Sequence, residues 1–268
     1  TTGENRDFHK TDLREKRDRL KQAIAVVFEE SLTKKREQTR SSLTVNDCDC
    51  HRALVEKYLQ PKDTIITFNY DCVIDYALKS AGSDKWNARY GYGFNLGKRG
   101  SALLGDEYWQ PQKRANKQET VQLLKLHGSL HFDVGGRTSP PKVKLKERPY
   151  TKQRGNLKFK IIPPEWHKAY DDPFFRILWK KAAAAIHGTQ HIILIGYSLP
   201  ETDLHSTALF LTSVKKGNLT SLVVVNPDRA ARHRIRRVLQ RGLQSSTRVL
   251  SFDHFSEFIK SDPSIWRI

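Results

Sequence analysis

The chain has 268 residues, 38% of them hydrophobic and 10% aromatic, and a formal net charge of +18. Enough apolar residues are present for a folded core, which excludes a disordered chain, and no apolar run is long enough for a membrane-spanning helix. Three cysteines are too few for a disulfide framework, so we expect a cytoplasmic protein. The charge predicts attraction to nucleic acid or other polyanions, or to acidic partner subunits.

Apolar strands alternate with amphipathic helices along most of the chain. In chain order we expect a helix over 12–39, a helix over 51–59, a strand over 64–68, a helix over 71–79, a strand over 121–126, a helix over 174–186, a strand over 191–195, a helix over 203–214, a strand over 221–225, a helix over 228–241, a strand over 247–251 and a short terminal helix. This alternation predicts an α/β fold with a parallel sheet and helices on both faces.

The first expected helix is amphipathic, with Asp12 and Glu15 spaced as a capping pair at its start. Its apolar residues are Leu13, Leu20, Ile24, Val27 and Phe28. They recur at intervals of three, four and seven, which predicts one helix face turned towards the core.

Two stretches, about 80–120 and 133–172, interrupt the alternation and are expected to be insertions in a single domain over 1–268. Glycines at 91, 93 and 97 follow no apolar strand, so they predict a turn and not a dinucleotide-binding loop. Residues 135–160 are rich in lysine and arginine with little apolar content, which predicts a mobile or partner-facing segment.

A metal site is not expected. Cys48 and Cys50 precede His51, but a fourth ligand at zinc-like spacing is missing from the sequence.

Polar residues and glycines follow the best predicted strands. They are Asn69 and Asp71, His127 and Gly128, Gly196 and Ser198, and Asn226 and Asp228. Parallel sheets bind ligands beyond the carboxyl ends of their strands, so these residues predict a shared site. Helix capping alone would also explain Asp71 or Asp228.

Four segments in order resemble the sirtuin-like family: TFNYD (67–71), LHGS (126–129), IILIGYSLPETD (192–203) and VVVN (223–226). The Asn-Tyr-Asp form is most similar to bacterial sirtuin-like domains of anti-phage systems. The resemblance implies a Rossmann-like three-layer domain that binds NAD and cleaves its nicotinamide–ribose bond.

The chain departs from the family in two places. No cysteine follows Cys72, so the zinc module of sirtuin deacylases is absent, which favours NAD hydrolysis without zinc over protein deacylation. The family's Gly-Ala-Gly-x-Ser loop, which cradles the NAD pyrophosphate, is also absent. Either this loop precedes Thr1 in a longer chain, or the protein binds NAD poorly.

The resemblance also implies roles for individual residues. Asn69 would hold the ribose or a water, His127 would be the general base, and Asp71 would bind the nicotinamide carboxamide or cap a helix. The remaining NAD-binding residues would be Thr67, Gly128, Gly196, Ser198 and Asn226.

The expected function is that of an NAD glycohydrolase acting as an anti-phage effector, in a homo-oligomer or with a DNA-translocating ATPase or Argonaute-type partner. A protein deacylase is one alternative. Another is a non-catalytic nucleotide- or nucleic-acid-binding module that uses the basic insertion and the arginines of residues 228–241.

Overall fold

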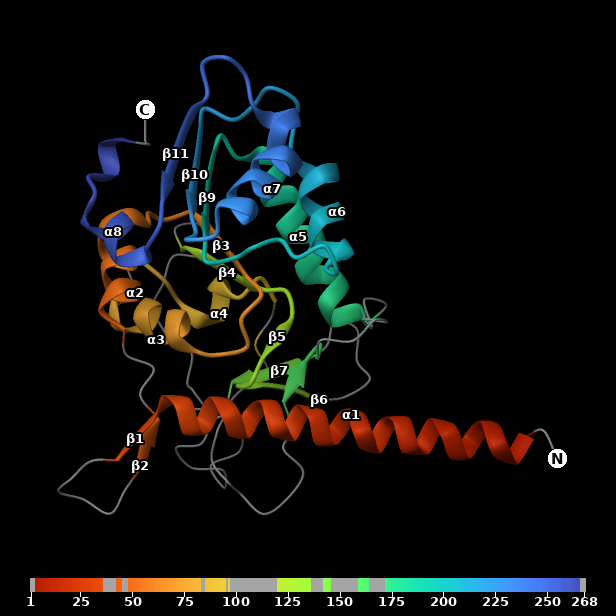
Figure 1. Ribbon diagram of the computed structural model, residues 1–268. Helices are drawn as coiled ribbons and strands as arrows, with labels where there is room; N and C mark the ends of the chain where they lie inside the picture. The colour runs from red at the N-terminus through yellow and green to blue at the C-terminus, as the bar shows by residue number, and fades with distance from the viewer. Residues whose placement is uncertain are drawn as a thin grey trace. The chain divides into compact units, whose positions relative to one another are not determined.

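The computed structural model describes residues 3–35, 42–44, 48–82, 85–94, 96, 120–135, 142–145, 159–163 and 172–265 (Figure 1). The chain divides into two compact units. Unit 1 comprises residues 1–47 and 61–176, and unit 2 comprises residues 48–60 and 177–268.

Unit 1 is built around a pair of parallel strands and several short antiparallel ladders. Its elements are α1 (Gly3–Leu32), β1 (Thr33–Lys35), β2 (Ser42–Thr44), β3 (Thr64–Thr67), α3 (Val73–Ser80), α4 (Ala88–Gly91), β4 (Gln122–Lys125), β5 (Gly128–Ser129), β6 (Phe132–Gly135), β7 (Lys142–Leu145) and β8 (Lys160–Ile161). Strand β3 pairs in parallel with β4, with Ile65 opposite Leu123. The antiparallel pairs are β1–β2, β5–β8 and β6–β7.

Aromatic rings fill the interior of unit 1. The ring of Tyr92 lies 5.2 Å from that of Trp86 and 5.3 Å from that of Phe132, both edge-on. Phe132 in turn lies 5.9 Å from Phe174, at the start of α5 (Pro173–Gly188), a helix that extends into unit 2. Such edge-to-face contacts add to the free energy of burying the rings.

Helix α1 differs from its prediction at both ends and in the face that it buries. It runs from Gly3 to Leu32 and not over 12–39, so Asp12 lies inside it and pairs with Lys16 at 2.7 Å. Ala25 packs against Leu130 and Ile161, with Ile24 and Phe28 beside it. The predicted apolar positions Leu13, Leu20 and Val27 are exposed instead. The seven-residue spacing of those three residues follows a face other than the packed one.

The segment over 135–160, expected to be mobile or partner-facing, contains the short strand β7, and most of the rest of the segment lies outside the described residues. Strand β7 pairs with β6, and its Val143 and Leu145 are buried. The sequence Lys142-Val143-Lys144-Leu145 alternates basic and apolar residues, the pattern of a half-buried strand. The high lysine content concealed that pattern.

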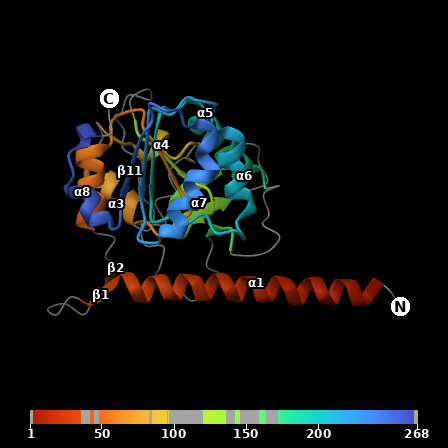
Figure 2. The same cartoon turned by 45° about the horizontal axis from the view of Figure 1, so that its top comes forward.

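Unit 2 contains a three-stranded parallel sheet in the order β11–β10–β9. Its elements are α2 (Asp49–Ala53), η1 (Leu54–Tyr58), most of α5, β9 (His191–Ile195), α6 (Leu204–Ser213), β10 (Ser221–Val225), α7 (Arg229–Leu239), η3 (Gln240–Gly242), β11 (Arg248–Phe252), α8 (Phe255–Lys260) and η4 (Pro263–Ile265). Central strand β10 is buried along its whole length. Figures 1 and 2 show α6 and α7 on one side of this sheet and α2 with α8 on the other.

The helix predicted over 51–59 is observed as α2, continued by the π-helical turn η1. Tyr58, the last residue of η1, bonds to residues about 200 positions further along the chain in unit 2. The Tyr58 hydroxyl donates to the Phe258 carbonyl at 2.8 Å and also contacts the Ser261 carbonyl at 2.6 Å. The Tyr58 and Phe258 rings lie 4.7 Å apart.

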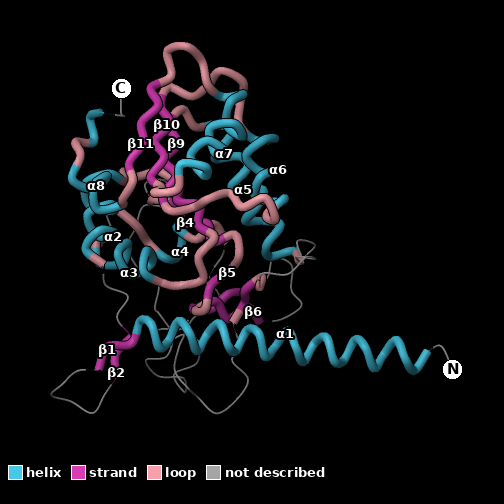
Figure 3. Tube along the Cα trace, in the orientation of Figure 1, coloured by secondary structure: helices cyan, strands magenta, loops and turns pink. Residues whose placement is uncertain are grey.

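Most predicted elements match the structure (Figure 3). Strands over 191–195 and 221–225 have the predicted bounds, and the predicted α/β class with parallel strand pairing is confirmed, although unit 1 also contains antiparallel pairs. The expectation of one domain over 1–268 stays a prediction. None of the described helices is long and apolar enough to cross a membrane.

Candidate functional site

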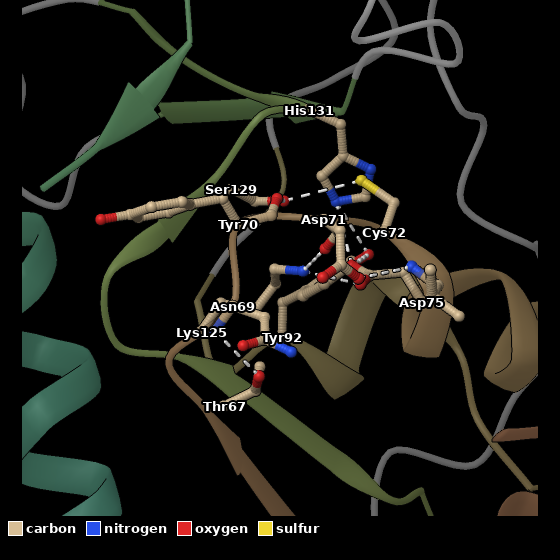
Figure 4. A network of polar contacts seen from close by, with 11 residues as sticks. Thr67, Asn69, Tyr70, Asp71, Cys72, Asp75, Tyr92, Lys125, Ser129 and His131 are labelled. Atoms are coloured by element: carbon tan, nitrogen blue, oxygen red, sulfur yellow. Dashed lines mark hydrogen bonds and ion pairs between the residues drawn. The ribbon is translucent and has the colours of Figure 1, made fainter. Parts of the chain in front are cut away.

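The turn after β3 carries the Asn69–Asp71 segment (Figure 4). The Asn69 amide donates to Thr67 Oγ1 at 3.2 Å, and the Val73 amide donates to Asp71 Oδ1 at 3.0 Å. The Asp71 side chain therefore accepts from the first amide of α3, although Asp71 lies one residue before the N-cap residue Cys72, whose own side chain makes no capping bond. Asn69 is exposed at the surface of the turn.

Donors from the segment around β4 and β5 fix the backbone of this turn. The Tyr70 carbonyl accepts from Ser129 Oγ at 3.2 Å and from the Leu130 amide at 3.1 Å. The Asp71 carbonyl accepts from the ammonium group of Lys125. Because Ser129 and Lys125 are fully buried, water does not compete for these bonds, and the turn is held in one conformation.

A cluster of charged and polar side chains lies beneath the turn, and we call Asp75, Tyr92, Lys125 and His131 the buried cluster. Asp75 Oδ2 lies 2.8 Å from Lys125 Nζ, and Asp75 Oδ1 lies 3.1 Å from His131 Nε2. The Tyr92 hydroxyl donates to Asp75 Oδ1 at 2.6 Å. All four side chains are 0% exposed (Figure 4).

The buried cluster shifts the pKa values of its own members. Burial disfavours the Asp75 carboxylate, but Lys125 and His131 outweigh burial and hold the pKa of Asp75 well below its usual range. Burial also disfavours a charged His131, but neighbouring Cys72 and Asp75 raise the pKa of His131 to about 9. At neutral pH the cluster therefore contains a carboxylate between two cations.

His127 follows β4 and lies beside the turn. Its imidazole is 8% exposed, and its ring centre lies 5.1 Å from that of Phe68 and 6.4 Å from that of Tyr70. The two residues that flank Asn69 therefore both contact the His127 ring. The prediction that Asn69 and His127 belong to one site is consistent with this geometry.

Gly128 is required by close packing. Its φ is +83°, and a Cβ at this position would collide with the Lys160 carbonyl oxygen of the paired strand β8. Any other residue would separate the two strands. The sequence analysis assigned Gly128 to NAD binding, and the structure adds a packing role.

The segment after β9 is clamped by one arginine. Arg234 Nε donates to the Leu199 carbonyl at 2.8 Å, and Arg234 Nη2 donates to the Ser198 carbonyl at 2.7 Å. Gly196 has a φ of +69° and Leu199 a φ of +47°, so the chain turns sharply at both residues. Arg234 thus fixes the conformation of the segment that carries Ser198.

Asn226 ties the end of β10 to the same segment. Its Nδ2 donates to the Tyr197 carbonyl at 3.4 Å, and its Oδ1 accepts from the Asp228 amide at 2.9 Å. Asp203 and Asp228 cap α6 and α7, which for Asp228 confirms the capping interpretation. The carboxylate of Asp203 also accepts from the Tyr197 hydroxyl at 2.8 Å.

The structure thus groups the predicted residues in two sets. Thr67, Asn69, Asp71, His127 and Gly128 lie together at the carboxyl ends of β3 and β4 in unit 1, whereas Gly196, Ser198 and Asn226 lie together in unit 2. The buried cluster was not predicted from the sequence. Two sequence features could have indicated it: a lysine within the apolar strand VQLLKL, and Asp75 on the buried face of α3.

Comparison with protein families identifies a SIR2-like domain over residues 63–257, which includes every predicted site residue. The chain belongs to the SIR2-like domain family. No curated protein matches it. Membership implies a Rossmann-like fold and NAD-related activity, because SIR2-like domains are typically NAD-consuming enzymes.

Within the described part of this SIR2-like domain, no three His, Cys, Asp or Glu side chains form a group that could hold a metal ion. Cys48 and Cys50 are half-buried free thiols. Whether the protein acts without zinc stays a prediction.

Proposed function

We propose that this SIR2-like domain hydrolyses NAD at the bond between nicotinamide and ribose. The observation that carries the proposal is the fixed turn after β3, which exposes Asn69 while both residues next to Asn69 contact the His127 ring. A site that binds an oxocarbenium-like transition state benefits from groups already held in position.

The reaction needs little acid catalysis. As the C1′–N bond breaks, its electron pair moves to the cationic nicotinamide ring, which leaves neutral, and positive charge develops on the ribose. A water oxygen then forms the new bond to C1′. His127 accepts the proton of that water, a task suited to an imidazole near neutral pH.

Asn69 presents an amide that both donates and accepts hydrogen bonds, so it would hold the ribose hydroxyls or the attacking water. Asp71 Oδ1 is already bound to the Val73 amide, which favours its capping role over binding of the carboxamide. In unit 2, Ser198 would donate to phosphate or ribose, and Asn226 would contact the adenosine ribose.

Hydrolysis is preferred to deacylation because no cysteine follows Cys72, so the paired cysteines of zinc-dependent deacylases are absent. The likeness of the Asn-Tyr-Asp segment to anti-phage domains extends the proposal to a cytoplasmic effector that depletes NAD. Such an effector would work in a homo-oligomer or with a DNA-translocating ATPase or Argonaute-type partner.

The decisive experiment incubates the protein with NAD and follows nicotinamide and ADP-ribose by chromatography, with and without added DNA. We expect equal release of both products, lost in Asn69→Ala and His127→Ala. His254→Ala removes an exposed histidine elsewhere and is the matched control. Release that persists unchanged in His127→Ala would contradict the assigned base. Absence of both NAD binding and turnover under every condition would contradict the proposed function.

A further inference from the structure

One face of α7 is strongly basic. The buried residues Ala231, Ile235 and Leu239 recur every four positions and define its inner face. Arg229, Arg236 and Arg237 are exposed, on the opposite side of the helix. Figures 1 and 2 show α7 beside α6 on the outside of the unit 2 sheet.

The structure separates these arginines from those with internal roles. Arg232 donates to the Asn226 carbonyl at 3.1 Å and pairs with Asp253. Arg234 clamps the carbonyls of the segment after β9. The internal contacts of α7 thus use Arg232 and Arg234, and Arg229, Arg236 and Arg237 point to solvent.

A neighbouring turn extends the basic surface. The Gly217 amide donates to the Arg241 carbonyl at 3.0 Å, so the turn that carries Lys215 and Lys216 lies beside Arg241. All three basic residues are exposed. We call the combined set the α7 basic face, which consists of Lys215, Lys216, Arg229, Arg236, Arg237 and Arg241.

Arg236 and Arg237 lie in the last turn of α7, where a cation favours the helix dipole, but the positive charge of the face as a whole is not neutralised within the helix. Residues 229–241 contain no Asp or Glu, so α7 has no acidic side chain to pair with its own arginines at a spacing of three or four. Like charges at such spacings destabilise a helix. Asp253 lies near Arg229 and Arg232 and neutralises positive charge only at that end of the face. An anionic partner would neutralise the remaining positive charge.

We infer that the α7 basic face binds the phosphate backbone of double-stranded nucleic acid. Guanidinium groups bind phosphate oxygens through paired N–H donors. At about 1.5 Å of rise per residue, the arginines from 229 to 241 span roughly 18 Å of helix, enough to meet several phosphates. Residues 229–241 contain no Phe, Tyr or Trp on which unpaired bases could stack, which favours a duplex over a single strand. This inference does not depend on NAD turnover.

The test measures binding of a short labelled duplex to the whole chain by fluorescence anisotropy over a range of salt concentrations. We expect the logarithm of the binding constant to fall linearly with the logarithm of salt concentration. The double variant Arg236→Gln/Arg237→Gln should reduce that slope by about 2, because each lost phosphate contact removes ~0.9. Circular dichroism would verify that the variant is folded.

The matched control is Lys180→Gln/Lys181→Gln, which removes the same charge from exposed positions on α5. An equal reduction of the salt-dependence slope in both variants would show that binding depends only on net charge, and would overturn the inference. Tighter binding of a single strand of the same length, or equal binding of polyglutamate, would also overturn it. These outcomes are independent of NAD hydrolysis, which the same variants should retain.

Discussion

Lys125 and Asp75 form an ion pair of 2.8 Å in which both side chains are 0% exposed. Charges are costly to bury, so such a pair persists only where additional hydrogen bonds satisfy both groups. Here Tyr92 and His131 contact the carboxylate, and the ammonium also binds the Asp71 carbonyl. The pair therefore connects helix α3, strand β4 and the turn that carries Asn69.

Lys125→Met should lower the free energy of unfolding by about 3–5 kcal/mol, because Asp75 would be left charged and buried without its main partner. Lys125→Met/Asp75→Leu should recover a substantial part of that loss, since it removes both charges. Urea denaturation of the single and double variants measures both effects. A loss below about 1 kcal/mol in Lys125→Met would contradict the importance of the pair.

The stability of the protein should fall as the pH rises from about 6.5 to about 9. The pKa of His131 is raised from 6.5 to about 9 in the folded chain. The charged His131 therefore contributes fully to the free energy of unfolding below pH 6.5, and this contribution is lost as the pH rises to about 9. Lys125 and Asp75 stay charged over this range, and burial beside Asp75 raises the pKa of Tyr92, which contacts both Asp75 and His131, well above its usual value. His131→Gln should flatten the pH dependence of the urea midpoint, and Cys72→Ala should weaken it, because Cys72 is one of the two neighbours that raise the pKa of His131.

Gly128→Ala should destabilise the protein by about 2 kcal/mol or more. Alanine disfavours the positive φ at this position, and its methyl group would collide with the Lys160 carbonyl. Gly82 also has a positive φ but has open space around it, so Gly82→Ala separates the backbone effect from the collision. Equal losses in the two variants, measured by thermal unfolding, would rule out a packing role for Gly128.

Asp71→Asn and Asp71→Ala should differ in stability. Asparagine retains an oxygen that accepts from the Val73 amide, whereas alanine loses the cap at a cost of about 1 kcal/mol. If Asp71 acts only as a cap, Asp71→Asn should also retain NAD turnover. A loss of turnover in a stably folded Asp71→Asn protein would instead support contact with the carboxamide.

Arg234→Lys should weaken NAD binding more than it slows the chemical step. Lysine cannot reproduce the two-pronged contact with the carbonyls of Ser198 and Leu199, so the segment would lose its fixed conformation. We expect KM to rise several-fold with little change in kcat. Steady-state kinetics tests this expectation. A fall in kcat at constant KM would place Arg234 in the chemistry.

Local patterns in the sequence were sufficient for the regular elements. Strand β10 begins at Ser221, continues with four apolar residues and is followed by Asn226, and its bounds were predicted correctly. The caps Asp203 and Asp228 were also recognisable, because capping depends on residues only a few positions apart. Basic residues in β7 concealed an equally simple alternation.

The buried cluster could not be predicted in the same way, because its members are far apart in the chain. Asp75 and Lys125 meet only when β3 and β4 pair, and Tyr92 arrives from a segment with no clear periodicity. The exposed positions Leu13 and Leu20 illustrate the same limit. Periodicity identifies an apolar face, but only tertiary contacts decide which face is buried.

The bonds from Tyr58 to Phe258 and Ser261 have a consequence for dissecting the protein into fragments. A fragment begun at residue 177 would contain the whole three-stranded sheet but would lack Tyr58 and leave the surface of α8 uncovered. A shortened chain in which a designed linker replaces residues 61–176 would join residues 48–60 to residue 177 and keep both partners in one polypeptide. Unit 2 is discontinuous in sequence, and such an internal replacement is the rational way to express it alone.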